Sequence, residues 1–166
     1  MDFEEKRRIF IEKWGILSER WGVPRSTGRV HAYLISSEKS LCAEDVISGL
    51  GISAGSVNAA LRSLAGWGLL ERSISESTRK DYYQAVKDPW IVVSRVLQER
   101  RKREIEPLLE LCEELTTGAG YSDESRELDG FLSEVHGLGR KADKALRRVI
   151  KSEESFFLSL IQKAMK

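Results

Sequence analysis

The chain has 166 residues, of which 41% are hydrophobic and 32% charged, and its formal net charge is +1. This length fits one domain with an extension or two small domains, and the hydrophobic fraction is enough for a buried core. The near-zero charge gives weak support to nucleic-acid binding, because such proteins usually carry a basic excess. Residues 1–90 hold 13 Lys and Arg against 12 Asp and Glu, and residues 91–166 hold 14 against 14, so a basic surface must come from arrangement.

Several functional classes find no support in the sequence. Cys42 and Cys112 are far apart and have no CxxC partner, which argues against a zinc site or a disulfide framework. There is no glycine-rich phosphate loop, HExxH motif or serine elbow, so we predict neither an enzyme nor a cofactor nor a metal site. No apolar run approaches the roughly 20 residues that span a bilayer, and the charged N-terminus does not resemble a signal peptide. We therefore expect a cytoplasmic protein with no membrane partner.

The first predicted element is a helix over residues 3–21. Apolar residues recur along it at three- and four-residue steps: Phe3, Ile9 or Phe10, Trp14, Leu17 and Trp21. Gly22 ends the helix, and Val23-Pro24 prevents its continuation. We expect this helix to lie outside the core formed by the middle of the chain and to need a partner subunit or the C-terminal helices to cover its apolar stripe.

A second helix is predicted from the segment that begins at Pro24, with Val30, Tyr33, Leu34 and Ile35 toward the core. Arg25 and Arg29 lie near its start, where a cation opposes the helix dipole. This placement favours an anionic partner for both side chains. A phosphate and a neighbouring carboxylate are the two alternatives. His31 is interpreted as a surface histidine or one with its hydrogen bonds satisfied, and not as a ligand.

The most informative stretch, residues 41–85, begins with a helix-turn-helix pattern. Leu41 is expected to form a very short strand, Cys42 occupies a helix N-cap position, and Gly51 can adopt the left-handed conformation that ends the first helix. Ser53 is a favourable N-cap for the second helix. In that helix Val57, Ala60, Leu61 and Leu64 share one face at helical spacing.

The opposite face of the second helix is small and polar. Side chains of this kind allow a helix to approach the major groove and to contact base edges or phosphates. We therefore predict a recognition helix over residues 53–67, with these DNA-contacting residues: Ser53, Gly55, Ser56, Asn58, Ala59, Arg62 and Ser63.

A β-hairpin is predicted after the recognition helix. Residues 69–74 alternate as a strand does, residues 75–78 form a polar turn, and residues 81–86 are aromatic and β-prone. Arg79 and Lys80 lie beside the turn, so we predict a basic wing over residues 71–85 that contacts the DNA backbone or minor groove. A helix-turn-helix followed by such a β-hairpin wing constitutes a winged-helix domain. The alternative is a winged-helix module that binds other proteins and does not read DNA.

These residues carry a family resemblance. Residues 24–30, residues 53–62, the basic wing and Asp88-Pro89-Trp90 resemble the glycine-betaine-synthesis repressor (GbsR) branch of the MarR winged-helix regulators. The match runs from about Trp14 to the mid-chain helix, and it departs from the family pattern at Cys42, where Ser or Thr is more frequent. The resemblance implies a homodimer with two winged helices, a helical dimerisation region, transcriptional control and, in some members, a small-molecule effector.

The remaining residues predict long amphipathic helices. Pro89 is suited to the first turn of a helix over residues 90–115, in which Pro107 should produce a kink. Residues 116–121 are expected to form a loop, and Ser122 to cap a helix over residues 122–165 that Gly137 and Gly139 bend or break. The apolar stripes exceed what one chain can cover, which favours an intertwined homodimer.

Two clusters leave alternatives open. The basic residues within 98–104 indicate either a nucleic-acid patch or, as we prefer, a solvated helix face balanced by Glu99, Glu104 and Glu106. Trp14, Trp21 and Trp90 suggest either a cage for a quaternary ammonium effector or, as we prefer, aromatic packing between winged helix and dimer helices.

We therefore predict a mainly α fold with a small β-hairpin wing. Its parts are an N-terminal dimerisation helix (1–22), a winged helix-turn-helix (23–88) and a C-terminal dimerisation region (89–166). The predicted function is sequence-specific DNA binding as a homodimeric transcriptional regulator, with repression as the expected direction of control.

Overall fold

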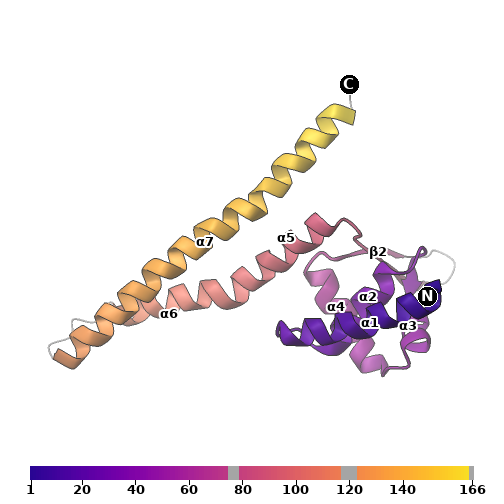
Figure 1. Ribbon diagram of the computed structural model, residues 1–166, viewed down its shortest axis with the longest axis horizontal. Coiled ribbons are helices and arrows are strands. Elements are labelled where there is room, and N and C mark those ends of the chain that lie inside the picture. Colours follow the sequence, from indigo (N-terminus) through magenta and orange to yellow (C-terminus); the bar gives the residue numbers. More distant parts are fainter. Residues whose placement is uncertain (75–78, 117–122, 165–166) are drawn as a thin grey trace. The chain divides into compact units, whose positions relative to one another are not determined.

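The computed structural model describes residues 1–74, 79–116 and 123–164, with side chains of the last range described from 126 to 151. The chain forms two compact units, Met1–Asp88 and Pro89–Lys166. The first unit combines helices with the sheet, and the described part of the second unit is entirely helical (Figure 1). Because residues 75–78 and 117–122 lie outside the described residues, the polar turn, the loop and the Ser122 cap expected there stay predictions.

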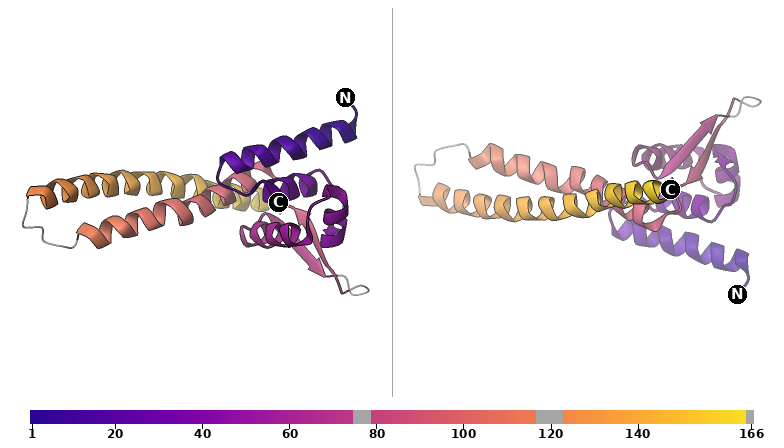
Figure 2. Two further views of the ribbon diagram at one scale, coloured as in Figure 1. Left: turned by 90° about the horizontal axis from the view of Figure 1, so that it is seen from below. Right: turned by 90° about the horizontal axis from the view of Figure 1, so that it is seen from above.

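The first unit is a winged helix preceded by an additional helix. Its described elements follow one another in this order: α1 (Phe3–Arg20), α2 (Arg25–Ile35), β1 (Leu41–Cys42), α3 (Ala43–Leu50), α4 (Ala54–Gly66), β2 (Leu70–Ile74) and β3 (Asp81–Ala85). In the described part, the strands form one antiparallel sheet in the order β1-β3-β2. The hairpin of β2 and β3 extends away from the helices (Figure 2).

Local signals place α3 and α4 as the sequence predicts. Gly51 has φ +61°, so it ends α3 in the left-handed region that favours glycine. Ser53 caps α4 by accepting a hydrogen bond from the Ser56 N–H at 3.2 Å. The Cys42 N–H donates to Asp45 Oδ2 at 2.9 Å, as in a capping box, although the cap residue is Cys. Leu41 pairs with Tyr83, which confirms the short strand.

The core of the first unit lies between α2, α3, α4 and the base of the wing. Its fully buried side chains come from all of these elements: Val30, Leu34, Val46, Val57, Leu61, Leu64 and Leu69. All four residues predicted for the inward face of α4 are buried, so the helical phase inferred from the sequence is confirmed.

The packing of α1 differs from the expectation. This helix packs against α2 inside the first unit, and its buried residues are Ile11, Gly15 and Ser18. Phe3 and Trp21, two residues of the apolar stripe that is expected to need a covering surface, are 63% and 49% exposed. The physical reason is close helix approach: a Cβ at Gly28 of α2 would lie 2.6 Å from Ser18 Cβ, so small residues define the contact.

The second unit is a helical hairpin. One arm consists of α5 (Pro89–Arg100), a π-helical turn (Arg101–Ile105) and α6 (Glu106–Thr116), and the other arm is α7 (Asp123–Ala164). The two arms run in opposite directions and pack side by side (Figures 1 and 2). A kink is expected at Pro107; the structure shows a π-helical turn just before this residue, where the Glu106 N–H bonds to the Arg101 carbonyl.

Of the bend or break expected in the last helix, the break is wrong. Gly137 and Gly139 both lie within the continuous helix α7. Gly139 is buried, and a Cβ there would lie 2.9 Å from Leu109 Cδ2, so this glycine lets α7 approach α6 closely. Among the described residues, no helix combines the length and apolarity that crossing a bilayer requires.

Candidate DNA-binding surface

The outward face of α4 is the centre of the candidate site. Because Val57, Ala60, Leu61 and Leu64 are at most 1% exposed, the opposite face of the same helix is turned to solvent. Gly55, Asn58, Ala59 and Arg62 are exposed there, while Ser56 and Ser63 are half-buried at its edges. The structure thus brings together on one helix face the residues that the sequence singled out.

This face is open at Gly55. A Cβ built at Gly55 meets no atom within 4 Å, so the lack of a side chain there is not required by internal packing. The side chains of Asn58 and Arg62 form no hydrogen bond or ion pair with any residue of the described part. The face therefore offers an amide and a guanidinium group, both able to bond base edges or phosphates, beside a position without steric bulk.

The wing carries three cations, which differ in their surroundings. Arg79 is exposed and has φ +54° at the start of β3. Lys80 Nζ lies 3.3 Å from Glu44 Oε1 at the start of α3, and contact with that carboxylate raises the pKa of Lys80. Arg72, which the sequence analysis did not single out, bonds Asp81 Oδ2 at 2.8 Å across the hairpin. Cross-strand register, which a sequence alone does not specify, is what brings Arg72 to Asp81.

Of the two anionic partners considered for Arg25 and Arg29, the structure shows the carboxylate. Arg25 Nη2 lies 2.9 Å from Glu12 Oε2, and Arg29 Nε lies 2.9 Å from Glu12 Oε1. Both guanidinium groups therefore share one carboxylate of α1. A DNA phosphate would have to compete with Glu12, so their assignment to DNA stays a prediction with less support than that of Arg62.

Of the aromatic residues considered for a ligand cage, Trp14 contacts other rings within the first unit. Trp14 is half-buried, and its ring centroid lies 5.4 Å from that of Phe10 and 6.4 Å from that of His31. Trp21 is exposed at the end of α1, and Trp90 belongs to the second unit. The contacts of Trp14 are those of aromatic packing within the winged helix.

His31 is a buried neutral imidazole. It is 4% exposed, and burial lowers its pKa to about 4. Its Nε2 atom has no hydrogen-bond partner in the described part of the chain. In the same part, no group of three or more His, Cys, Asp or Glu side chains is arranged to hold a metal ion.

The basic residues of 98–104 are mostly neutralised. Arg101 bonds Glu106 at 2.7 Å and Asp143 at 2.5 Å, and Lys102 bonds Glu99 at 3.0 Å. The two Arg101 contacts place this side chain between α6 and α7. Two of these carboxylates, Glu99 and Glu106, are among those proposed to balance the cluster, so the geometry agrees with the solvated-face interpretation.

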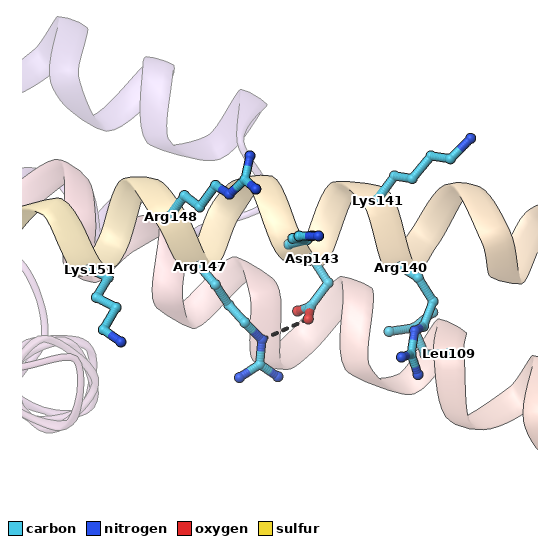
Figure 3. A pocket seen from close by; sticks show the side chains of 8 residues that line it. Leu109, Arg140, Lys141, Asp143, Arg147, Arg148 and Lys151 are labelled. Atoms are coloured by element: carbon cyan, nitrogen blue, oxygen red, sulfur yellow. Dashed lines mark hydrogen bonds and ion pairs between the residues drawn. The ribbon is translucent and has the colours of Figure 1, made fainter.

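Sequence reasoning missed a second basic cluster. Residues 140–151 of α7 hold six Lys and Arg side chains and one carboxylate, Asp143. They line an open groove of about 790 Å³ together with Leu109 of α6 (Figure 3). Counting charge over shorter windows would have found this cluster, which the totals for half of the chain conceal.

Comparison with known proteins supports the fold. No protein-family model and no curated protein matches the chain. The crystal structure of a transcriptional regulator matches it with a TM-score of 0.70 at 18% identity, covering 90% of this chain and 99% of that one. A mutant of S. aureus MepR bound to an oligodeoxyribonucleotide matches with a TM-score of 0.40 at 14% identity, covering 81% and 91%. The fold is therefore that of a winged helix with long additional helices, as found in a known transcriptional regulator.

Proposed function

We propose that this protein is a sequence-specific DNA-binding transcriptional regulator of the GbsR-like branch of the MarR family. In this proposal α4 enters the major groove and the wing contacts the backbone or minor groove. The observation that carries it is the two-faced α4: one face is fully buried, and the other exposes Asn58 and Arg62 around an open Gly55. The likeness of the whole fold to a transcriptional regulator supports the same conclusion.

The wider form of the proposal includes a cytoplasmic homodimer that represses its target genes. The exposed apolar side chains of the second unit support dimerisation, because Leu111, Leu128 and Phe131 are each at least 50% exposed. The family resemblance supports repression and a small-molecule effector.

The decisive experiment measures binding of the full chain to DNA from upstream of its own gene and to random DNA, at several salt concentrations. Each phosphate contact contributes about 0.9 to the slope of log K against log salt. We expect tighter binding to the upstream DNA, and Arg79→Ala should weaken both DNAs together and flatten the slope by about one per protomer. Equal binding of both DNAs by the wild type would reject sequence-specific recognition.

A second candidate function is a winged-helix module that binds proteins. It is favoured by the net charge of +1 and by the Glu12 and Glu44 carboxylates that lie beside Arg25, Arg29 and Lys80. Under this alternative, neither Arg62→Ala nor Arg79→Ala changes any DNA affinity.

A further inference from the structure

The second unit separates its charges along its length. The basic half comprises residues 89–105 and 140–151, which hold 11 Lys and Arg against 3 Asp and Glu. The acidic half comprises residues 106–116 and 126–139, which hold 7 Asp and Glu against 1 Arg. Because the two arms of the hairpin are antiparallel, residues of like charge from both arms lie at the same end (Figure 1).

The basic half carries an open groove. Its cationic lining residues come from α7: Arg140, Lys141, Lys144, Arg147, Arg148 and Lys151. Lys141 and Arg148 extend on one side of α7, while Arg140, Arg147 and Lys151 extend on the other (Figure 3). The one carboxylate of this group, Asp143, is held by Arg101 and Arg147 at 2.5 and 2.7 Å, which lowers its pKa and leaves the positive charge in excess.

The acidic half carries exposed apolar side chains among its carboxylates. Leu111, Leu115, Leu128, Phe131 and Leu138 are 49–66% exposed. An apolar surface of this extent favours burial against another protein, and its surrounding charges select the orientation of that partner.

We propose that the basic groove of one chain receives the acidic half of a second copy, so that two hairpins associate antiparallel. The two-fold symmetry of such a pair makes both acidic-to-basic contacts at once. A parallel pair places acidic on acidic and basic on basic, which is repulsive. This inference rests on the homodimer in the proposed function and adds its orientation and its dependence on charge.

The test reverses charges in the full-length chain and measures the dimer dissociation constant by sedimentation equilibrium. The basic-reversed variant carries Lys144→Glu, Arg148→Glu and Lys151→Glu, and the acidic-reversed variant carries Glu110→Lys, Glu127→Lys and Glu134→Lys. Each should weaken the wild-type dimer at least about tenfold, because attraction becomes repulsion at both symmetric contacts. The six-fold variant, with both reversals, should recover affinity to within about threefold of wild type.

Orientation is measured separately with spin labels. Residues 127 and 134 lie 12 and 5 residues from the charge boundary at 139, and a helix rises about 1.5 Å per residue. An antiparallel pair centred on this boundary therefore separates two labels at Glu127→Cys by about 36 Å along the axis and two at Glu134→Cys by about 15 Å. Cys42 and Cys112 are buried at 5% and 1% exposure, which limits their labelling. Equal, short distances at both positions would overturn the proposal.

The outcomes separate this inference from the proposed function. If the wild-type protein is a monomer in sedimentation equilibrium, both the homodimer and this inference are rejected. The DNA-binding assay tests DNA recognition independently of that result. A dimer unaffected by the basic reversal, or a folded six-fold variant that stays weak, overturns only the antiparallel contact. A basic-reversed dimer of normal affinity that loses binding to random DNA also overturns it, because the groove then serves nucleic acid.

Discussion

Arg62 and the other candidate DNA-contacting cations differ in what already surrounds them. Arg25 and Arg29 share Glu12, and Lys80 lies beside Glu44. A phosphate that binds these side chains must replace an existing ion pair, although an exposed pair contributes only about 0–1 kcal/mol. Arg62 forms no such pair with the described residues. DNA can therefore engage its guanidinium group without replacing an ion pair formed within the described residues.

Replacing Arg62 tests base reading directly. Arg62→Ala should reduce operator affinity about 5- to 150-fold per contact, because a good bidentate base contact contributes about 1–3 kcal/mol, and it should affect random DNA much less. Fluorescence anisotropy with both DNAs measures this difference. Arg20→Ala, the same change of charge at an exposed position of α1, is the control. A parallel loss on both DNAs would assign Arg62 to the backbone.

His31 makes the stability of the winged helix depend on pH. Its pKa is about 4 in the folded protein and about 6.5 when unfolded, so the unfolded chain binds more protons between these values. The free energy of unfolding should therefore fall by about 3 kcal/mol from this group as pH decreases from 6.5 to 4. Urea denaturation across this range measures the slope. His31→Leu should flatten it, and an unchanged slope in this variant would exclude His31 as its source.

At the scale of elements, two glycines on neighbouring helices have opposite surroundings. A Cβ at Gly28 of α2 would lie 2.3 Å from Ser18 Oγ and 3.1 Å from Gly15 Cα. A Cβ at Gly55 of α4 meets nothing within 4 Å. The first glycine is required by helix packing, whereas the second leaves room that only an external partner can use.

The two alanine variants should therefore behave differently. Gly28→Ala should destabilise the protein by about 1–3 kcal/mol, because it forces α1 away from α2. Gly55→Ala should stabilise α4 by about 0.5–1 kcal/mol and yet weaken operator binding, because its methyl group enters the DNA-facing surface. Chemical denaturation and anisotropy measure the two effects. Operator affinity unchanged in Gly55→Ala would place DNA elsewhere than on this face.

Truncating a side chain on the buried face of α4 should lower the free energy of unfolding by the amount typical of a core residue. Leu61 is 1% exposed, so Leu61→Ala should cost about 2–5 kcal/mol of unfolding free energy. Ile74→Ala on β2 is the control, because Ile74 is 67% exposed and its truncation should change stability by no more than about 0.5 kcal/mol. Circular dichroism melts compare the two. Equal losses would show that burial on α4 does not determine stability.

At the scale of the whole molecule, the proposed dimer constrains its DNA site. Two-fold symmetry requires a near-palindromic operator, with half-sites about 34–36 Å apart or a multiple of that distance. Footprinting should show two protected half-sites on one face of the DNA, and light scattering should show a dimer at micromolar concentration. Insertion of five base pairs between half-sites should abolish cooperative protection, and retained protection would indicate independent binding of monomers.

The sequence determined the elements whose signals are local. The glycine at 51, the cap at Ser53 and the apolar spacing from Val57 to Leu64 act within one or two helical turns, so they specify α3, α4 and the face of α4 that is buried. The short strand at Leu41 and the irregularity near Pro107 follow from local chemistry in the same way. The candidate DNA-facing residues follow from them, because fixing one face of a helix fixes the other.

Only the tertiary structure decided the contacts between distant residues. The face of α1 that packs against α2 is formed by the small residues Gly15 and Ser18, which contact Gly28. Hydrophobic periodicity does not predict this face, because small residues allow two helices to approach closely but contribute little apolar area. Glu12 could be recognised as the partner of Arg25 and Arg29 only after α1 was placed on α2. The two charged halves of the second unit emerge only when the hairpin aligns its arms, since their charges nearly cancel in the sequence totals.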